Sequence, residues 1–112
     1  MNIYGASGHG KVVFDILKSR NIQIDSVFDD NFEVKEFLDF RVIHKPNKDQ
    51  LKKPTVLAIG NNAIRKKVAL KYKGVISEAI NHSHAIISEN IQIDSGTVIM
   101  PGAIINSGCR IG

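Results

Sequence analysis

The chain has 112 residues, of which 43% are hydrophobic and 23% charged, and its net charge at pH 7 is +4. This length suits one globular core with a short appendage, and the composition excludes a chain that is disordered throughout. No apolar run approaches the roughly 18 residues that a membrane span needs, and the first residues do not resemble a signal peptide, so a cytoplasmic location is expected. The lysines are scattered without interleaved aromatic residues, which favours a solvated basic surface over a nucleic-acid interface.

The first part of the chain alternates strand-like and helix-like stretches. Ile3 and Tyr4 form a strand before a glycine-rich turn, and apolar residues at helical spacing then predict a helix over residues 10–20. A second strand is expected over Ile24–Phe28. The pattern of residues 32–53 fits a hairpin as well as a short helix followed by a strand.

The next stretch continues this alternation after Pro54. Thr55–Ile59 is an apolar run typical of a buried parallel strand. An asparagine in the turn that follows can cap a helix over residues 62–73, and a last short strand is expected over residues 74–80. Strands and helices in alternation predict an α/β fold, a small Rossmann-like domain with a parallel sheet, over residues 1–81.

From residue 85 the pattern changes to a period of six. Isoleucine takes the third place of five successive hexads and glycine the last place of three, with Asn90 in the matching place of the first hexad: Ile87, Ile93, Ile99, Ile105, Ile111, Gly96, Gly102 and Gly108. A parallel β-helix with three flat sides needs one inward aliphatic side chain on each side and a residue that tolerates positive φ at each corner. Residues 82–112 therefore predict the first turns of such a helix. Cys109 takes a hexad place that favours small residues, and we expect it to pack there rather than act as a reactive thiol.

The turn after the first strand carries the clearest binding motif, Gly5-Ala6-Ser7-Gly8-His9-Gly10-Lys11. Its G-x-x-G-x-G spacing differs from the G-x-G-x-x-G of dinucleotide binders, which counts against NAD. Glycines let the backbone approach a ligand, and the N-terminus of a helix favours an anion. We therefore expect phosphate binding by this loop, with hydrogen bonds from Ser7 and His9; a strand-to-helix turn without a ligand is the alternative. The candidate residues of the loop are Gly5, Ser7, Gly8, His9 and Gly10.

Polar residues follow two other strands at the same expected edge of the sheet. Asp29 and Asp30 come after the second strand, where a carboxylate can accept hydrogen bonds from a ribose or a base, or can form an Asx turn. The second loop follows the strand after Pro54, and its candidates are Gly60, Asn61, Asn62 and Arg65. Arg65 could neutralise a phosphate, or it could be solvated beside its neighbouring lysines.

The histidines do not predict a metal or catalytic site. His82 and His84 would face the same side of a strand, but no third ligand lies near them in the sequence. His44 gives no usable signal. Phosphate contact explains His9 as well as a general-base role does, so no residue is assigned as catalytic.

These motifs, in this order and over the whole chain, resemble the PglD/NeuD family of bacterial sugar acetyltransferases. The junction departs from the family at one place, because it reads His82-Ser83-His84-Ala85 where the family has a His-Pro-Ser-Ala-like segment. The resemblance implies a Rossmann-like domain that holds a nucleotide sugar, commonly a UDP-linked amino sugar. It also implies a left-handed β-helix that forms a homotrimer and holds acetyl-CoA between neighbouring subunits. The catalytic histidine of the family lies beyond residue 112.

The resemblance thus predicts the substrate-binding portion of a nucleotide-sugar acetyltransferase of surface-glycan synthesis, with acetyl transfer assigned to a longer parent protein. A stand-alone sugar-nucleotide-binding or assembly module without catalysis is an alternative, and so is a folded fragment without ligand affinity. The sugar, the nucleotide, and the choice between nitrogen and oxygen as acetyl acceptor are left open.

Overall fold

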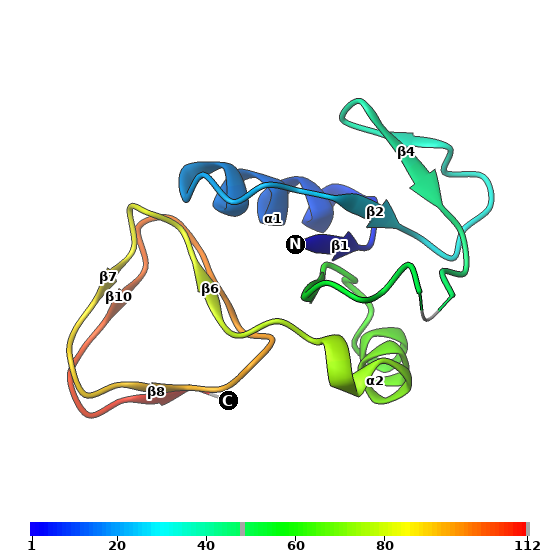
Figure 1. Cartoon of the computed structure of the whole chain (residues 1–112). Coiled ribbons are helices and arrows are strands. Elements are labelled where there is room, and N and C mark those ends of the chain that lie inside the picture. Colours follow the sequence, from blue (N-terminus) through cyan, green and yellow to red (C-terminus); the bar gives the residue numbers. More distant parts are fainter. Residues whose placement is uncertain (48, 112) are drawn as a thin grey trace.

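The computed structural model describes residues 1–47 and 49–111, so the end of the second predicted domain at Gly112 lies outside the described residues. Two units follow one another along the chain: an α/β unit and a coil with a triangular outline (Figure 1). The elements of the α/β unit are β1 (Asn2–Tyr4), α1 (Gly8–Ser19), β2 (Ser26–Phe28), β3 (Glu36–Phe37), β4 (Phe40–Ile43), β5 (Thr55–Leu57), α2 (Asn62–Lys71) and a 3₁₀ turn (Lys73–Val75). Those of the coil are β6 (Ile80–Asn81), β7 (Ile86–Ile87), β8 (Gln92–Ile93), β9 (Val98–Ile99), β10 (Ile104–Ile105) and β11 (Arg110–Ile111).

The sheet of the α/β unit has the strand order β3-β4-β2-β1-β5. β4, β2, β1 and β5 run parallel, and β3 pairs antiparallel with β4. The predicted Rossmann-like α/β fold is therefore confirmed. Of the two alternatives for residues 32–53, the described residues form the hairpin, with strands over Glu36–Phe37 and Phe40–Ile43.

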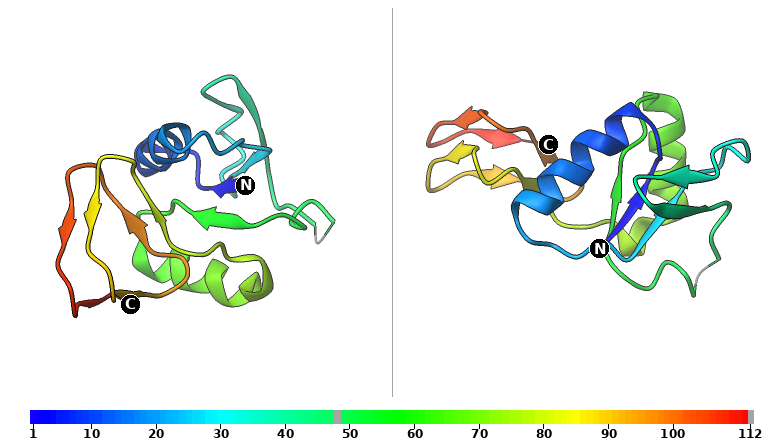
Figure 2. Two further views of the ribbon diagram at one scale, coloured as in Figure 1. Left: turned by 60° about the vertical axis from the view of Figure 1, so that its left-hand side comes forward. Right: turned by 90° about the horizontal axis from the view of Figure 1, so that it is seen from above.

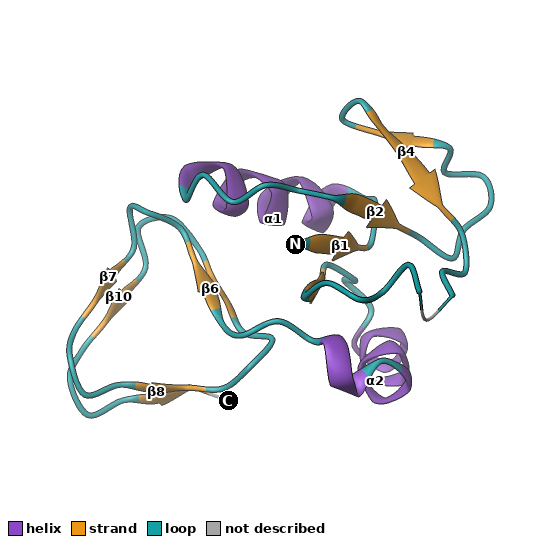
Figure 3. Cartoon of the chain, in the orientation of Figure 1, coloured by secondary structure: helices purple, strands orange, loops and turns teal. Residues whose placement is uncertain are grey.

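The two helices cover opposite faces of this sheet (Figure 3). Side chains alternate across a strand, so Ile3 of β1 faces α1 and joins the core cluster that contains Val13 and Leu17. Its neighbour Tyr4 faces the other side and joins the cluster that contains Val68 of α2. β5 is an edge strand, yet Thr55–Leu57 has no exposed residue, because Val56 joins one core cluster, Leu57 joins the other, and Thr55 is bridged to Ile76.

The helix predicted over residues 10–20 begins earlier, at Gly8, because the last part of the glycine loop already has helical geometry. The apolar residues of α2 pack only partly into the core. Val68 is buried, but Ile64 is 50% exposed, because α2 rests on the sheet through few residues. Asn61 caps α2 as predicted, since its side chain accepts a hydrogen bond from the Ile64 amide at 3.0 Å.

The strand expected over residues 74–80 does not form as a sheet strand. The 3₁₀ turn takes its first part, and Ile76 makes a single parallel bridge to Thr55. Ile80 pairs with Val98, so the end of this stretch already belongs to the coil.

The coil is the start of a left-handed parallel β-helix, as predicted. Its strands pair parallel at an offset of 18 residues, as in Ile86 with Ile104 and Ile87 with Ile105. The corner residues all have positive φ: Asn90 (+60°), Gly96 (+80°), Gly102 (+78°) and Gly108 (+85°). The hexad isoleucines point inward, where Ile99 is 6% exposed and the others are half-buried. Cys109, which we expected to be a small packing residue, is exposed.

The coil packs against the α/β unit beside the C-terminal end of α1 (Figure 2). Arg20 Nε donates to the Asn81 carbonyl at 3.0 Å, and the Ser83 amide donates to Ser19 Oγ at 3.1 Å. Ile80 also enters the core cluster beneath α1. These contacts fix the coil against the sheet.

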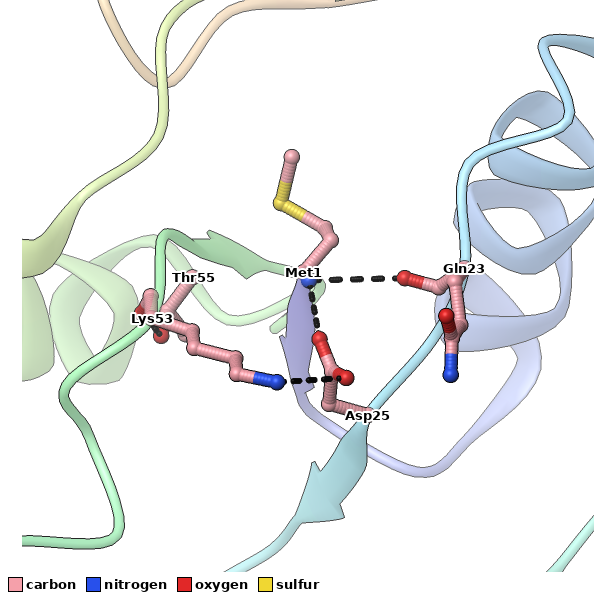
Figure 4. Close-up of polar contacts among 5 residues, drawn as sticks. All are labelled: Met1, Gln23, Asp25, Lys53 and Thr55. Atoms are coloured by element: carbon pink, nitrogen blue, oxygen red, sulfur yellow. Dashed lines mark hydrogen bonds and ion pairs between the residues drawn. The ribbon is translucent and has the colours of Figure 1, made fainter.

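The amino ends of β1, β2 and β5 carry an ionic cluster (Figure 4). The Asp25 carboxylate accepts hydrogen bonds from the Met1 ammonium group at 2.5 Å and from Lys53 at 2.9 Å. The hydrogen bond from the ammonium group, and then that from Lys53, lower the pKa of Asp25 below its usual value. This cluster lies at the edge of the sheet opposite the candidate site.

Candidate nucleotide-binding site

The carboxyl ends of β1, β2 and β5 meet at a cleft with a volume of about 230 Å³. In a parallel sheet the residues that follow each strand gather at this edge, which is where open α/β folds bind ligands. Five of the predicted site residues line the cleft: Gly5, Ser7, Asp29, Asp30 and Gly60. They come from three different loops, so the fold unites residues that are far apart in the sequence.

Two glycines of the first loop are required by packing. Gly5 has φ +125°, and a Cβ on it would lie 2.5 Å from the Ala58 carbonyl oxygen. A Cβ on Gly10 would lie 2.4 Å from the Gly5 carbonyl oxygen. Gly8 differs from both, because a Cβ there would meet no atom within 4 Å. The loop therefore has one glycine that lets it approach the end of β5, one that lets α1 approach Gly5, and one that faces open space.

The N-terminus of α1 presents unpaired donors beside the cleft. Ser7 occupies the N-cap position, but its hydroxyl makes no capping hydrogen bond. The first amide that bonds back is that of Lys11, which donates to the Ser7 carbonyl at 3.2 Å. The amides of residues 8–10 thus have no acceptor among the described residues. Such orphan amides, together with the helix dipole, favour a bound anion.

The two aspartates have different roles. Asp29 Oδ2 accepts from the Ala6 amide at 2.8 Å, and its Oδ1 accepts from the Asn31 amide at 2.8 Å. The second contact is the Asx turn that the sequence left open, and the first holds the glycine loop in place. Both oxygens of Asp29 are therefore used within the chain.

Asp30 is exposed and makes one contact in the cleft. The Tyr4 hydroxyl donates to its Oδ1 at 2.6 Å, so its second oxygen is available to a ligand. Burial, and then the hydrogen bond to Asp30, raise the pKa of Tyr4. The proton therefore stays on the tyrosine, which also packs against the rings of Phe28 and Tyr72 at centroid distances of 5.8 and 5.7 Å.

A second, larger cleft lies between α2 and the coil, with a volume of about 630 Å³. His9, Asn62 and Arg65 line this cleft rather than the smaller one. Arg65 Nη2 donates to Asn62 Oδ1 at 2.7 Å, which orients the guanidinium group. The opposite wall is a corner of the coil that includes Ser95 and Thr97. The remaining candidates, Gly8, Gly10 and Asn61, line neither cleft.

Sequence reasoning missed several residues of these clefts. Tyr4 was assigned to the strand core, and only the strand order places its hydroxyl against Asp30. Lys66, Ser95 and Thr97 in the larger cleft gave no signal, because the coil and α2 come together only in the fold.

The remaining histidines make contacts within the chain. The His84 amide donates to His82 Nδ1 at 3.0 Å. Within residues 1–47 and 49–111, no group of three potential ligands could hold a metal ion. His44 Nε2 lies 2.7 Å from the Val34 carbonyl oxygen, which gives it a structural role.

A parallel sheet with a glycine loop at its carboxyl edge, followed by 18-residue turns of a left-handed β-helix, defines the N-terminal portion of the nucleotide-sugar N-acetyltransferases. The family model described as the PglD N-terminal domain matches residues 1–72, and the chain belongs to this family.

Relatives and solved structures agree with this assignment. The chain is 36% identical over 107 residues to the UDP-N-acetylbacillosamine N-acetyltransferase of Bacillus subtilis, with 88% of this chain and 50% of that protein covered. It matches PerB from Caulobacter crescentus, solved in complex with CoA and GDP-perosamine, with a TM-score of 0.84 and 25% identity over 99% of this chain and 56% of that one.

The acetyltransferase domain of PglB from Neisseria gonorrhoeae, in complex with acetyl coenzyme A, shares the fold with a TM-score of 0.78 and 23% identity. That match covers 99% of this chain and 58% of the PglB chain. The chain thus spans about half the length of these proteins. Among the described helices, none is both long and apolar enough to cross a membrane.

Proposed function

We propose that this chain is the substrate-binding part of an acetyltransferase that acts on a UDP-linked amino sugar in bacterial surface-glycan biosynthesis. The observation that carries the proposal is the cleft at the carboxyl edge of the sheet, which is lined by Ser7, the N-cap residue of α1, and by Asp30 with its free oxygen. The similarity to an enzyme named for a UDP sugar supports the choice of nucleotide.

The chemistry of the two clefts assigns a part of the ligand to each. The amides of residues 8–10 and the Ser7 hydroxyl bind the diphosphate, because they are donors at the positive end of a helix. Asp30 accepts a hydrogen bond from the ribose or from the imide of the base. His9 connects the clefts, since its amide belongs to the loop and its side chain lines the larger cleft, which would receive the sugar.

Acetyl transfer belongs to a longer protein in this proposal. Acetyl-CoA is the donor, and the general base is supplied by residues outside this chain. A homotrimer is supported by one feature of the coil: Ile86 and Ile104 pair in register on an outer side and are 62% and 66% exposed. An apolar pair of this kind suits burial between subunits. A cytoplasmic location is part of the same proposal.

Calorimetric titration of the chain with UDP, a UDP-amino sugar, GDP and NAD tests the binding role. The UDP ligands should bind and NAD should not. Asp30→Asn should weaken UDP binding by about 10-fold or more, as expected for the loss of a charged hydrogen bond. Asp15→Asn is the matched control, because Asp15 is exposed on α1 and lines neither cleft. NAD binding as tight as that of UDP would contradict the proposal.

The assignment of acetyl transfer to a longer protein has its own test. The assay measures the consumption of acetyl-CoA by this chain with a UDP-amino sugar as acceptor. We expect no turnover above background. Turnover at the rate of a complete relative would show that the catalytic base lies within these residues.

A further inference from the structure

The outer face of α2 has a composition that the nucleotide site does not explain. Val68 is buried against the sheet, and a rotation of about 100° per residue places the opposite side of the helix in solvent. One exposed flank of the helix, between about 60° and 160° from Val68, is called the α2 outer face below. It consists of Ala63, Lys67, Leu70 and Lys71, none of which lines either cleft of the candidate site. Leu70 is 68% exposed and lies at the edge of this face that is farthest from Val68.

The charge around this face is of one sign. Between Gln50 and Ser77 the sequence has seven lysines and arginines and no aspartate or glutamate. Lys52 and Lys53 have ion-pair partners, in Asp49 and Asp25. In the part of the chain that the structure describes, the five basic residues from Arg65 to Lys73 form no ion pair.

Most of this arrangement does not stabilise the helix, since only Lys71 lies in the last turn, where the helix dipole favours a cation. The first turn of α2 contains no acidic residue, and its first basic residues come close to the positive end of the helix dipole. Lys67 and Lys71 are four positions apart, a spacing at which like charges repel. A positive field beside an exposed leucine fits an anionic partner with an apolar layer beneath it.

We propose that the α2 outer face binds an anionic lipid surface, with Leu70 entering the boundary between headgroups and acyl chains and the lysines contacting lipid phosphates. Basic helices that also expose apolar residues bind membrane surfaces. A nucleic acid would use the lysines but not the exposed leucine. The proposal is independent of the nucleotide site and does not need it.

The test is co-sedimentation of the chain with vesicles of phosphatidylcholine, alone or with about 30 mol% phosphatidylglycerol. The chain should bind only the anionic vesicles, and about 0.5 M salt should release it because screening then acts within a few ångströms. Lys67→Gln with Lys71→Gln should weaken binding by roughly 30-fold, and Leu70→Gln by roughly 10-fold.

Matched controls distinguish the effect of this face from the effects of net charge and of nonspecific hydrophobic adsorption. Lys11→Gln with Lys35→Gln removes the same charge elsewhere, and Phe32→Gln replaces an apolar side chain outside α2 that is 55% exposed. These controls should keep the affinity of the parent chain, and circular dichroism checks that every variant is folded. Equal binding to neutral vesicles, or equal loss in the controls, would overturn the proposal. So would self-association of the chain that depends on Leu70 and replaces lipid binding.

Discussion

Replacing Gly5 with alanine should destabilise the fold by about 3 kcal/mol. Gly5 has φ +125°, a conformation that costs an L residue roughly 1–3 kcal/mol. The new Cβ would also lie 2.5 Å from the Ala58 carbonyl oxygen and 2.7 Å from its carbon, so the end of β5 would have to shift. A loss of this size should lower the melting temperature by more than about 10 °C in a domain of this length.

Gly8→Ala in the same loop is the matched control. Its added Cβ meets no atom within 4 Å, and its position in the first turn of α1 favours alanine over glycine, so stability should be unchanged or up to about 1 kcal/mol higher. Urea unfolding followed by circular dichroism measures both variants, with the slope m unchanged. A Gly5→Ala variant within about 0.5 kcal/mol of the parent, or a Gly8→Ala variant as unstable as Gly5→Ala, would refute the packing argument.

Three further predictions concern stability. The pKa of Asp25 is lowered in the folded state, so its contribution to the free energy of unfolding is complete above roughly pH 5 and is lost as the pH falls. Asp25→Asn should therefore make stability fall less steeply with acid, and an unchanged acid limb of the stability curve would count against the ionic cluster. The pKa of Tyr4 is raised in the folded state, so its contribution to the free energy of unfolding is present below roughly pH 10 and is lost as the pH rises. Tyr4→Phe should therefore flatten the alkaline limb of the same curve, and an alkaline limb as steep as before would contradict this role of Tyr4. In the coil, Ile99→Ala should cost about 2–4 kcal/mol in urea unfolding and Ile104→Ala less than about 0.5, because the first is 6% and the second 66% exposed; equal costs would disprove the inward register.

The coil could be predicted from the sequence because its constraint is local and repeated. Each hexad places one isoleucine inward and one corner residue at positive φ, so the pattern reports the geometry directly. Asn90 shows that the corner, rather than glycine itself, is the repeated feature, since it holds φ +60° in the place of a glycine. The glycine loop was predictable for the same reason, because a tight turn after a strand is specified by residues that are neighbours in the sequence.

Features that depend on how elements meet could not be predicted in this way. The hydrogen bond between Tyr4 and Asp30 requires β1 and β2 to be neighbours in the sheet, and the sequence does not predict this strand order. Ile64 has the spacing of a core residue and yet is half exposed. Periodicity predicts which face of a helix is apolar, but it does not predict how much of that face the sheet covers. Ile80 was assigned to the first unit, although its partner strand begins at Val98 and forms the coil.

The grouping of predicted residues into two clefts was also beyond the sequence. The three loops could be placed at one edge of a parallel sheet, but the position of the coil decides which side chains face it. His9 and Arg65 turn toward the coil, whereas Ser7 and Asp30 line the smaller cleft. The contacts of Ser19 and Arg20 with the coil, together with the burial of Ile80 beneath α1, establish that geometry.

Chemical-shift mapping of the ¹⁵N-labelled chain during titration with UDP tests the central claim most directly, because each amide of the site reports separately. The account predicts the largest shifts at the amides of Gly8, His9 and Gly10, whose N–H groups have no acceptor in the chain, with smaller shifts at Asp30 and little change at Ile104 in the coil. Shifts concentrated in the coil, or none in the glycine loop at saturating UDP, would contradict it.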